Sequence, residues 1–393
     1  LHDLPKQIRF NMGECLNDKG GYFIIDGKEK CFIPQEVFAN NMINYTANDK
    51  DINYSHTAAI RCVSEDSSKP ARTMKVHIKK SNGTILVEIP NVRKPIPLFI
   101  LMRALGITSD KDIISYCLLD LEKNRGYLDA FISSVHDGGI ILTQELALKY
   151  ISIFTKKNTV IQDILINYFL PNVGEDNFIN KAYFLGNIVL NLLQVKFGVL
   201  QVTDRDNFKY KRVELIGTLM YDLFREYYVK QQKSIKTNIE RKFYFLKNEK
   251  NKLTIENSKK IFDDNFKGFL FDRKIFGIVE EGFKKAFKGN WGASSHTKRV
   301  GVIQDLNRLS FNSAIGQLRK LNLEMDASAK VQGPRLLHSS QYGIIDPIDT
   351  PDGGNVGTHK HLTMMAKISN NISGFKIKEW LFKTYDKYLI KIE

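Results

Sequence analysis

Residues 335–362 read RLLHSSQYGIIDPIDTPDGGNVGTHKHL, and this stretch has the most specific pattern in the chain. Asp346-Pro347 predicts a turn, because proline interrupts regular structure there. Residues 349–354 (DTPDGG) predict a tight, glycine-rich loop that carries two carboxylates. Gly357 permits a second backbone segment to approach closely. The stretch therefore indicates a sharply folded loop region rather than a helix or a long strand.

The loop and its flanks contain two carboxylates and three histidines: Asp349, Asp352, His338, His359 and His361. His359 and His361 alternate, so on a strand they would face the same side. One interpretation is an independent metal-dependent hydrolase built on four of these residues: His338, Asp349, Asp352 and His361. The other is that the carboxylates cap turns and pair with Arg335 or Lys360. The spacing of two carboxylates does not by itself establish acid–base chemistry.

Towards the N-terminus the pattern changes from β-type to helical. Two β-prone runs around Asp26-Gly27 predict a hairpin, and residues 72–79 and 84–89 alternate around a second turn. Apolar positions at helical spacing then predict helices at 98–105, 111–121, 143–154, 160–169, 181–197 and 211–228. Residues 300–321 predict a helix pair that breaks near Ser310.

The composition is that of an ordinary globular protein. Of the 393 residues, 43% are hydrophobic and 26% are charged, which excludes a disordered or fibrous chain. At roughly 100–200 residues per domain, the length predicts about two to four domains. The most apolar run, residues 96–102, is far shorter than the ~20 residues of a membrane span. The four cysteines show no C-x-x-C spacing and predict free thiols in a reducing compartment.

Positive charge is concentrated in one stretch of the chain. Lys and Arg number 58 against 43 Asp and Glu, which gives a formal net charge of +15. Residues 230–299 contain 18 Lys and Arg and 8 Asp and Glu, so they carry +10 of that charge, interleaved with phenylalanines. This bias favours a polyanionic partner. The alternative is a set of amphipathic helices with solvated lysine faces.

The two ends predict a segment of a longer polypeptide. The chain starts at Leu1 without an initiator methionine, and residues 388–393 alternate like an unfinished strand.

Ordered motifs in the last sixty residues carry a resemblance to a known family. They are residues 334–338 (PRLLH), Tyr342-Gly343, residues 347–353 (PIDTPDG) and Gly357. This order resembles the second-largest (β-type) subunit of multisubunit DNA-dependent RNA polymerases, in the style of eukaryotes, archaea and large DNA viruses. The family usually has Pro-x-Glu-Thr-Pro-Glu-Gly, so here aspartate replaces both glutamates. The charge is kept and the reach is one methylene shorter, which indicates a divergent lineage.

The resemblance covers nearly the whole chain through further motifs, among them GYFII, PLFILMRALG, KAYFLG, DRDNF and GNWG. It implies an α+β, multi-domain fold in which a mostly helical lobe with a β element is inserted into a mixed protrusion and followed by a fork. The implied divisions are a first protrusion segment (1–55), the lobe (56–230), a second, basic protrusion segment (231–288), the fork (289–369) and the start of a next region (370–393).

The resemblance implies a fragment of a DNA-directed RNA polymerase, a nucleotidyltransferase, that is inactive alone. The fragment would form a wall of the DNA cleft and the fork near the active centre. The implied partners are the largest subunit, other polymerase subunits, the DNA template and the RNA–DNA hybrid, with no membrane. Mg²⁺ is expected on another subunit and no cofactor in this chain. The expected location is the nucleus, or a cytoplasmic viral factory or virion.

The resemblance also assigns residues to the site. Cations expected near nucleic acid are Lys298, Arg299, Arg319, Lys320, Lys330 and Arg335. The loop expected to support the active centre contains His338, Asp349, Asp352 and Gly353. No residue is assigned a catalytic or metal-binding role. A second hypothesis remains, a stand-alone basic module that binds nucleic acid or a protein partner without an enzyme context.

Overall fold

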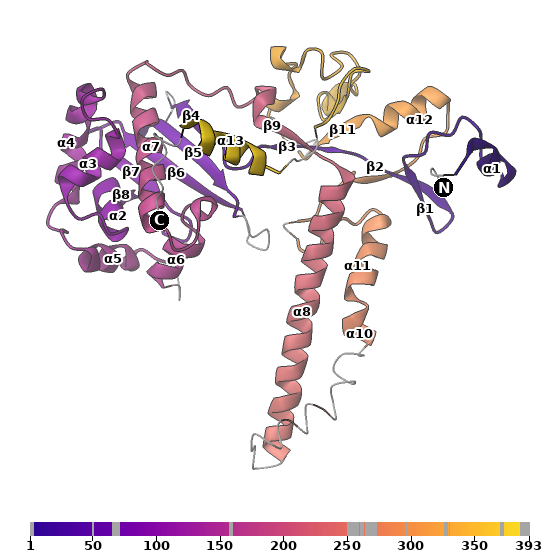
Figure 1. Cartoon of the computed structure of the whole chain (residues 1–393), viewed down its shortest axis with the longest axis horizontal. Coiled ribbons are helices and arrows are strands. Elements are labelled where there is room, and N and C mark those ends of the chain that lie inside the picture. Colours follow the sequence, from indigo (N-terminus) through magenta and orange to yellow (C-terminus); the bar gives the residue numbers. More distant parts are fainter. Residues whose placement is uncertain are drawn as a thin grey trace.

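The computed structural model describes residues 4–48, 51–64, 71–156, 160–249, 259, 263, 273–295, 297–325, 329, 331–369 and 373–385. The fold is α+β, as predicted, with helices and three separate sheets. Figure 1 shows a helical unit around one sheet, a central region of short strands, and the long helix α8 (Ile216–Glu249) extending away from both. No helix among the described residues is long and apolar enough to cross a membrane.

The segment predicted as the lobe contains most of a five-stranded antiparallel sheet in sequential order. Its strands are β4 (Ile43–Ala47), β5 (Tyr54–Cys62), β6 (Arg72–Lys79), β7 (Ile85–Glu88) and β8 (Ile96–Pro97). Residues 72–79 and 84–89 do pair, as predicted. Strand β4 lies in this sheet, so the sheet begins before residue 56, where the lobe was expected to start. The domain boundaries themselves remain a prediction.

Six helices pack with this sheet: α2 (Leu98–Ala104), α3 (Asp110–Leu118), α4 (Ile132–Gly138), α5 (Gln144–Ile153), α6 (Ile161–Asn167) and α7 (Phe178–Lys196). Every residue of α2 is buried, and Gly106 follows it with φ +106°, the left-handed conformation of a helix-ending glycine. Thr143 caps α5 by accepting the Leu146 amide. These helices and the sheet share one large hydrophobic core.

The contact between α3 and α7 depends on Gly186. A Cβ at this position would lie 2.3 Å from the carbonyl oxygen of Tyr116 and 3.1 Å from the Cα of Cys117. The aromatic rings of Tyr116 and Tyr183 stack beside the contact, with centroids 4.1 Å apart. The two helix backbones therefore touch at a distance that only glycine allows.

A three-stranded sheet joins the first predicted protrusion segment to the predicted fork. It contains β1 (Tyr22–Ile25), β2 (Lys28–Phe32) and β10 (Ile303–Asp305). Asp26 and Gly27 both have positive φ, which gives the predicted hairpin turn. The helix α11 (Ile278–Phe287) packs on this sheet, because Phe287 contacts both Phe23 and Phe32 through edge-to-face rings. Segments on either side of the lobe therefore lie together.

Two helix predictions were wrong at their ends. Residues 211–214 form strand β9 (Lys211–Glu214) rather than the start of a helix, because they pair with β3 (Gln35–Phe38). Residues 300–321 contain one helix, α12 (Phe311–Leu318), flanked by strands β10 and β11 (Lys320–Leu323). Ser310 is the N-cap of α12 in a capping box, so the predicted break is a helix start.

The central sheet joins three distant regions of the chain in the order β12 (His359–His361), β11, β3 and β9. Its middle contains Glu36, whose side chain is 1% exposed. The Lys360 Nζ lies 2.9 Å from Oε2 of Glu36, and the Lys211 Nζ lies 3.5 Å from Oε1. Burial lowers the pKa of Lys211, although Glu36 opposes this effect. One carboxylate therefore holds two buried cations from two other strands.

We expect Glu36→Gln to lower the free energy of unfolding by roughly 3–5 kcal/mol, because it leaves Lys211 and Lys360 buried without a counter-charge. Urea unfolding followed by circular dichroism measures the change. The triple variant Glu36→Leu, Lys211→Met, Lys360→Met removes all three charges and should regain most of the loss. If Glu36→Gln unfolds at the wild-type midpoint, the carboxylate does not hold the sheet together.

We expect Gly186→Ala to lower the free energy of unfolding by roughly 1–3 kcal/mol, because the new methyl group meets the Tyr116 carbonyl. Thermal unfolding measures the loss. Gly126→Ala is the matched control within the lobe, since its added Cβ meets nothing within 4 Å. Equal stabilities of the two variants would show that α3 and α7 can separate without cost.

Candidate nucleic-acid interface at the fork

The 346–357 loop is held by its own polar groups. Asp346 Oδ1 accepts the amides of Ile348 at 2.9 Å and Asp349 at 3.2 Å, and these bonds lower its pKa. Thr350 Oγ1 donates to the carbonyl of His359 at 3.0 Å and accepts the Gly357 amide at 2.9 Å. The loop is therefore pinned to strand β12, and through it to the central sheet.

Arg335 braces the same loop from the other side. Its Nη1 donates to the carbonyl oxygens of Gly354 at 2.5 Å and Val356 at 3.2 Å. Gly357 has φ +74°, and a Cβ there would lie 2.3 Å from the Arg335 carbonyl oxygen. Arg335 therefore bonds to backbone carbonyls, and neither Asp349 nor Asp352 is its partner. The pairing suggested from the sequence was wrong for Arg335.

Asp352 and Gly353 lie at the exposed tip of the loop. Gly353 has φ +67°, with open space where a Cβ would stand. Asp349 Oδ2 lies 3.2 Å from Nδ1 of His361, and the same nitrogen lies 3.1 Å from the Asp349 carbonyl oxygen. The predicted pairing of Asp349 or Asp352 with Lys360 was also wrong, because Lys360 is bound to Glu36.

His338 connects the fork to the end of the lobe. Its Nδ1 accepts the Ser340 amide at 3.1 Å, so Nε2 is the nitrogen that donates to Asp204, at 2.6 Å. This hydrogen bond lowers the pKa of Asp204. Ser340 Oγ accepts the amide of Phe208 at 2.8 Å. Hydrogen bonds of His338 and Ser340 thus connect residues 338–340 to residues 204–208.

The histidines and carboxylates of the hydrolase hypothesis do not converge. His338 bonds to Asp204, whereas His361 bonds to Asp349. Burial and the nearby Lys320 ammonium lower the pKa of His359. Within the described ranges, no group of three or more His, Cys, Asp or Glu side chains could hold a metal ion. The arrangement gives structural pairs rather than a metal centre.

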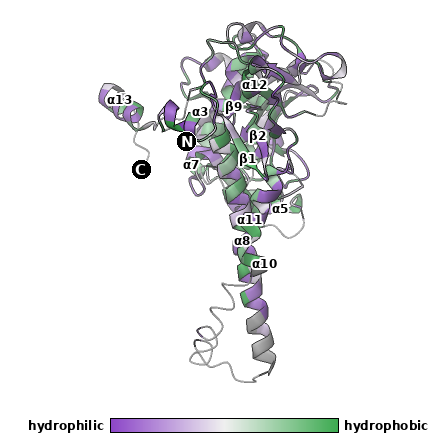
Figure 2. Ribbon diagram, turned by 90° about the vertical axis from the view of Figure 1, so that its right-hand side faces the viewer, coloured by the Kyte–Doolittle hydropathy of each residue, from purple (hydrophilic) through white to green (hydrophobic). Residues whose placement is uncertain are grey.

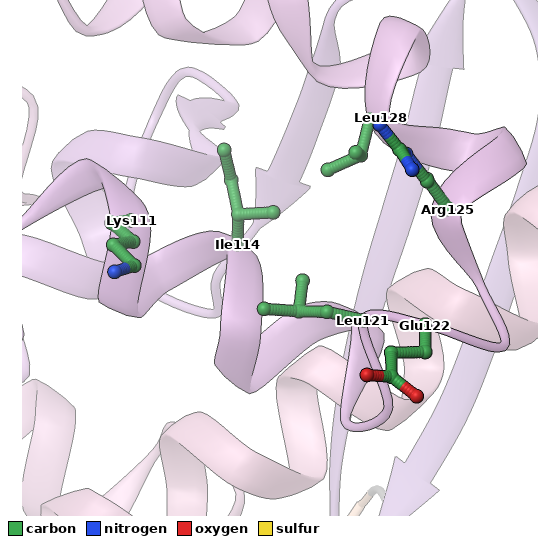
Figure 3. A pocket seen from close by; sticks show the side chains of 6 residues that line it. All are labelled: Lys111, Ile114, Leu121, Glu122, Arg125 and Leu128. Atoms are coloured by element: carbon green, nitrogen blue, oxygen red, sulfur yellow. The ribbon is translucent and has the colours of Figure 1, made fainter.

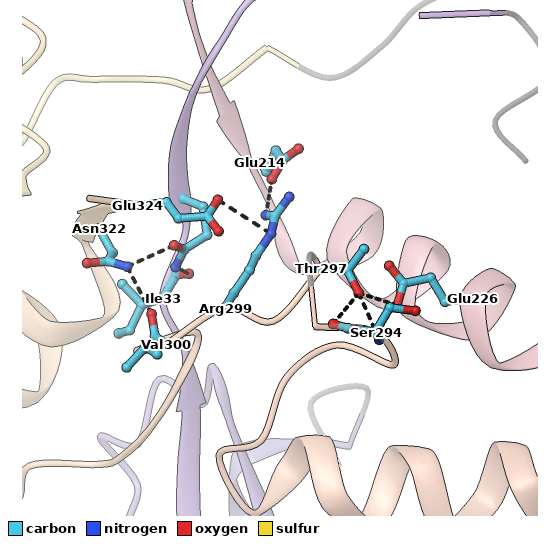
Figure 4. Close-up of polar contacts among 10 residues, drawn as sticks. Ile33, Glu214, Glu226, Ser294, Thr297, Arg299, Val300, Asn322 and Glu324 are labelled. Atoms are coloured by element: carbon cyan, nitrogen blue, oxygen red, sulfur yellow. Dashed lines mark hydrogen bonds and ion pairs between the residues drawn. The ribbon is translucent and has the colours of Figure 1, made fainter. Parts of the chain in front are cut away.

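The first fork loop, around residues 291–299, is fixed by carboxylates of other elements (Figure 4). Arg299 Nη1 lies 2.5 Å from Glu214 Oε2, and its Nε lies 3.7 Å from Glu324. Glu226 of α8 accepts the Ala293 amide at 2.9 Å and the Thr297 hydroxyl at 3.0 Å. The Arg299 charge is therefore largely compensated within the chain.

Two further predicted cations lie at the central sheet. Arg319 donates to the carbonyl oxygens of Leu362 and Thr363. Lys320 is the first residue of β11, opposite His361. Lys298, by contrast, is exposed and makes no ion pair with a described residue. Lys330 lies outside the described residues. The binding roles of all six cations remain predictions.

A cleft of about 780 Å³ lies between the lobe sheet, α8 and the first fork loop. Its lining includes four carboxylates: Glu214, Asp222, Glu226 and Glu324. Burial raises the pKa of Asp222, and the charge of Glu214 adds to the effect. Glu214, Glu226 and Glu324 could not be singled out from the sequence, because their partners are far away along the chain. Arg61, Arg225 and Arg299 line the same cleft, so the charge of the carboxylates is largely compensated.

The lobe has an open pocket of about 670 Å³ on its surface (Figure 3). Ile114, Leu121 and Leu128 form its apolar side, and Lys111, Glu122 and Arg125 lie around them. The pocket is built from residues 111–128, and none of the predicted site residues that the structure describes lines it.

Comparison with known proteins covers most of the chain. Residues 39–214 match the family model described as RNA polymerase Rpb2, domain 2, and residues 304–368 match RNA polymerase Rpb2, domain 3. The RNA polymerase II subunit RPB2 of Encephalitozoon cuniculi is 34% identical over 97% of this chain and 33% of its own length.

Similar relatives occur in plants and archaea. RNA polymerase II subunit 2 of Arabidopsis thaliana is 31% identical over 94% of this chain and 31% of the relative. The RNA polymerase subunit Rpo2 of Saccharolobus shibatae is 30% identical over 95% of this chain and 31% of the relative. The chain spans about a third of the length of these relatives. It belongs to the family of the second-largest subunits of eukaryotic and archaeal DNA-directed RNA polymerases, and corresponds to domains 2 and 3 of that family.

Proposed function

We propose that the chain works within a DNA-directed RNA polymerase, where it forms a wall of the DNA cleft and the fork and supports template-directed RNA synthesis. The observation that carries this proposal is the similarity to polymerase subunits over 97% of the chain. The motifs that carry the resemblance are also connected to one another and to the rest of the chain by hydrogen bonds of Arg335, Thr350 and His338. The proposed partners are the largest subunit, other polymerase subunits, the DNA template and the RNA–DNA hybrid.

The contacts of the proposed site residues favour two different roles, positioning of the fork and contact with phosphate. Arg299, Arg319 and Arg335 direct their guanidinium groups at carboxylates or carbonyl oxygens of the chain, which suits a positioning role. Lys298 is exposed and unpaired among the described residues, which suits contact with phosphate. The residues 349–353 would support the active centre by fixing the shape of the fork. The Mg²⁺ ions of the reaction are proposed to lie on another subunit.

The proposed location follows from the relatives. RNA polymerase II and III subunits of eukaryotes are among them, which supports the nucleus. A cytoplasmic viral factory or a virion, and a reducing compartment, stay predictions from the sequence. The four cysteines are free thiols, and three of them are buried.

We expect the chain to co-purify with a largest polymerase subunit from its native source, and the complex to incorporate nucleotides on a DNA template. Residues 1–393 alone should show no incorporation, because no metal-binding group is assigned to them. Affinity purification followed by a template-dependent incorporation assay tests both statements. Robust incorporation by the purified chain alone would contradict the assignment. Failure to co-purify with any polymerase subunit, with nucleic-acid binding retained, would support the stand-alone module instead.

In the assembled polymerase, we expect Lys298→Ala to reduce the slope of log K against log salt for DNA binding by about 0.7–0.9. Lys288→Ala is the matched control, since Lys288 is an exposed cation paired with Asp26 on the protrusion. Arg299→Ala should instead destabilise the fork, because it leaves Glu214 partly buried without its partner. An unchanged slope for Lys298→Ala would make this residue an ordinary surface charge.

A further inference from the structure

The long helix α8 presents a stripe of polar and basic side chains on one face. Six residues share this face at helical spacing: Lys230, Lys233, Ser234, Thr237, Asn238 and Arg241. Together with Ile275 they line a hollow of about 450 Å³. Ile275 belongs to the short helix α10 (Arg273–Phe276), which lies alongside α8 in Figure 1 and contributes two carbonyl oxygens to Gln231.

The stripe continues the face that holds α11 on α8. Nearer the body, Leu219, Leu223 and Tyr227 are buried on this face, and Tyr227 fills the space above Gly282. From Lys230 onward the apolar residues are replaced by polar ones, so this stretch of the face is not built to pack against an apolar helix. Figure 2 shows α8 projecting well beyond the sheets. The stripe therefore lies on the part of α8 that projects from the body, and its three cations are exposed.

The cations of the stripe are not paired with carboxylates of the described residues. Lys230, Lys233 and Arg241 are exposed, and none forms an ion pair with a described residue. No carboxylate lines the hollow among the described residues. Lys236 lies on the other side of the same helix and is paired with Glu240 at 3.9 Å. Among the described side chains from Lys230 to Arg241, the unpaired positive charge therefore gathers on one side of the helix.

The chemistry of the lining fits phosphate groups. Lys and Arg supply charge, and Ser, Thr and Asn supply the neutral donors that commonly bond to phosphate oxygens. The lining residues that the structure describes include no aromatic side chain, so they offer no platform for stacking the bases of a single strand. From residue 230 to residue 241 the helix rises about 16 Å. Duplex DNA laid along that length presents about ten phosphate charges.

We propose that this stripe binds the phosphate backbone of double-stranded DNA without reading its sequence. The choice of DNA as the partner rests on the proposed function, whereas the site itself rests on the stripe. It is a second contact, made by different residues from those of the fork. It gives the projecting helix a role that the fork motifs do not supply.

The test measures binding of the whole chain to a short, fluorescently labelled DNA duplex at several salt concentrations. The stripe variant carries Lys230→Ala, Lys233→Ala and Arg241→Ala. We expect its slope of log K against log salt to be smaller than that of the wild type by about 2–3, since each phosphate contact contributes about 0.9. The control variant carries Lys236→Ala, Lys284→Ala and Lys285→Ala, removes the same charge from α8 and α11, and should change the slope by less than about 1.

The outcomes separate the two proposals. Equal slopes for the stripe and control variants would overturn the stripe site and leave the polymerase assignment intact. An unlabelled duplex of unrelated sequence should compete as well as the labelled one, and failure to compete would also overturn a contact that reads no bases. Helix content by circular dichroism checks that the stripe variant is folded. If it is not, Lys233→Gln alone should still lower the slope by about 0.9, and an unchanged slope would refute the proposal.

Discussion

The carboxylate of Glu36 is the point on which the central region depends. It lies in the middle of a sheet whose strands come from residues 35–38, 211–214, 320–323 and 359–361. Lys360 and Lys211 approach it from two of the other strands, and both ammonium groups are buried. Buried charges are tolerated only when they are paired, so these strands must come together for any of them to be stable. The segments predicted as the lobe, the protrusion and the fork meet at this one interaction.

The geometry of the fork follows from this sheet. Strand β12 is fixed by Lys360, and Thr350 then ties the motif loop to β12. Arg335 spans the loop from the opposite side, where Gly357 permits backbone contact. All three arginines expected at nucleic acid, Arg299, Arg319 and Arg335, therefore bond to groups within the chain. These arginines hold the fork in shape. Exposed lysines such as Lys298 are then the cations whose charge is not already paired within the described residues.

The sequence predicted elements whose cause is local. The hairpin at Asp26-Gly27 depends on two adjacent residues with positive φ, and the helix predicted at 143–154 begins where Thr143 accepts an amide three residues away. The elements that it mispredicted depend on distant partners. Residues 303–305 lie within the predicted helix pair of 300–321 but pair with β2, and Lys211 pairs with β3. Tertiary pairing therefore overrode local preference in both cases.

The same limit applies to the candidate site, where features with local causes could be predicted and features with distant partners could not. The motif loop could be found from its glycines, prolines and aspartates. The role of Arg299 could not, since Glu214 is 85 residues away. The carboxylates of the cleft beside α8 likewise have no local signature. Charge sign and residue type indicated where cations gather, but only the folded structure shows which of them are already neutralised.

The pairing of Glu36 with Lys360 also sets an order of events during synthesis of the chain. The two residues are 324 positions apart, whereas the lobe sheet and its helices are made of neighbouring segments. At about 5–20 residues per second, a ribosome needs roughly 15–65 s to reach Lys360 after it has made Glu36. The lobe can finish folding in that interval, since its contacts are local. Strand β3 can pair with β9 once Lys211 has been made, so Glu36 then lacks only Lys360, and β12 is the last strand to join the central sheet.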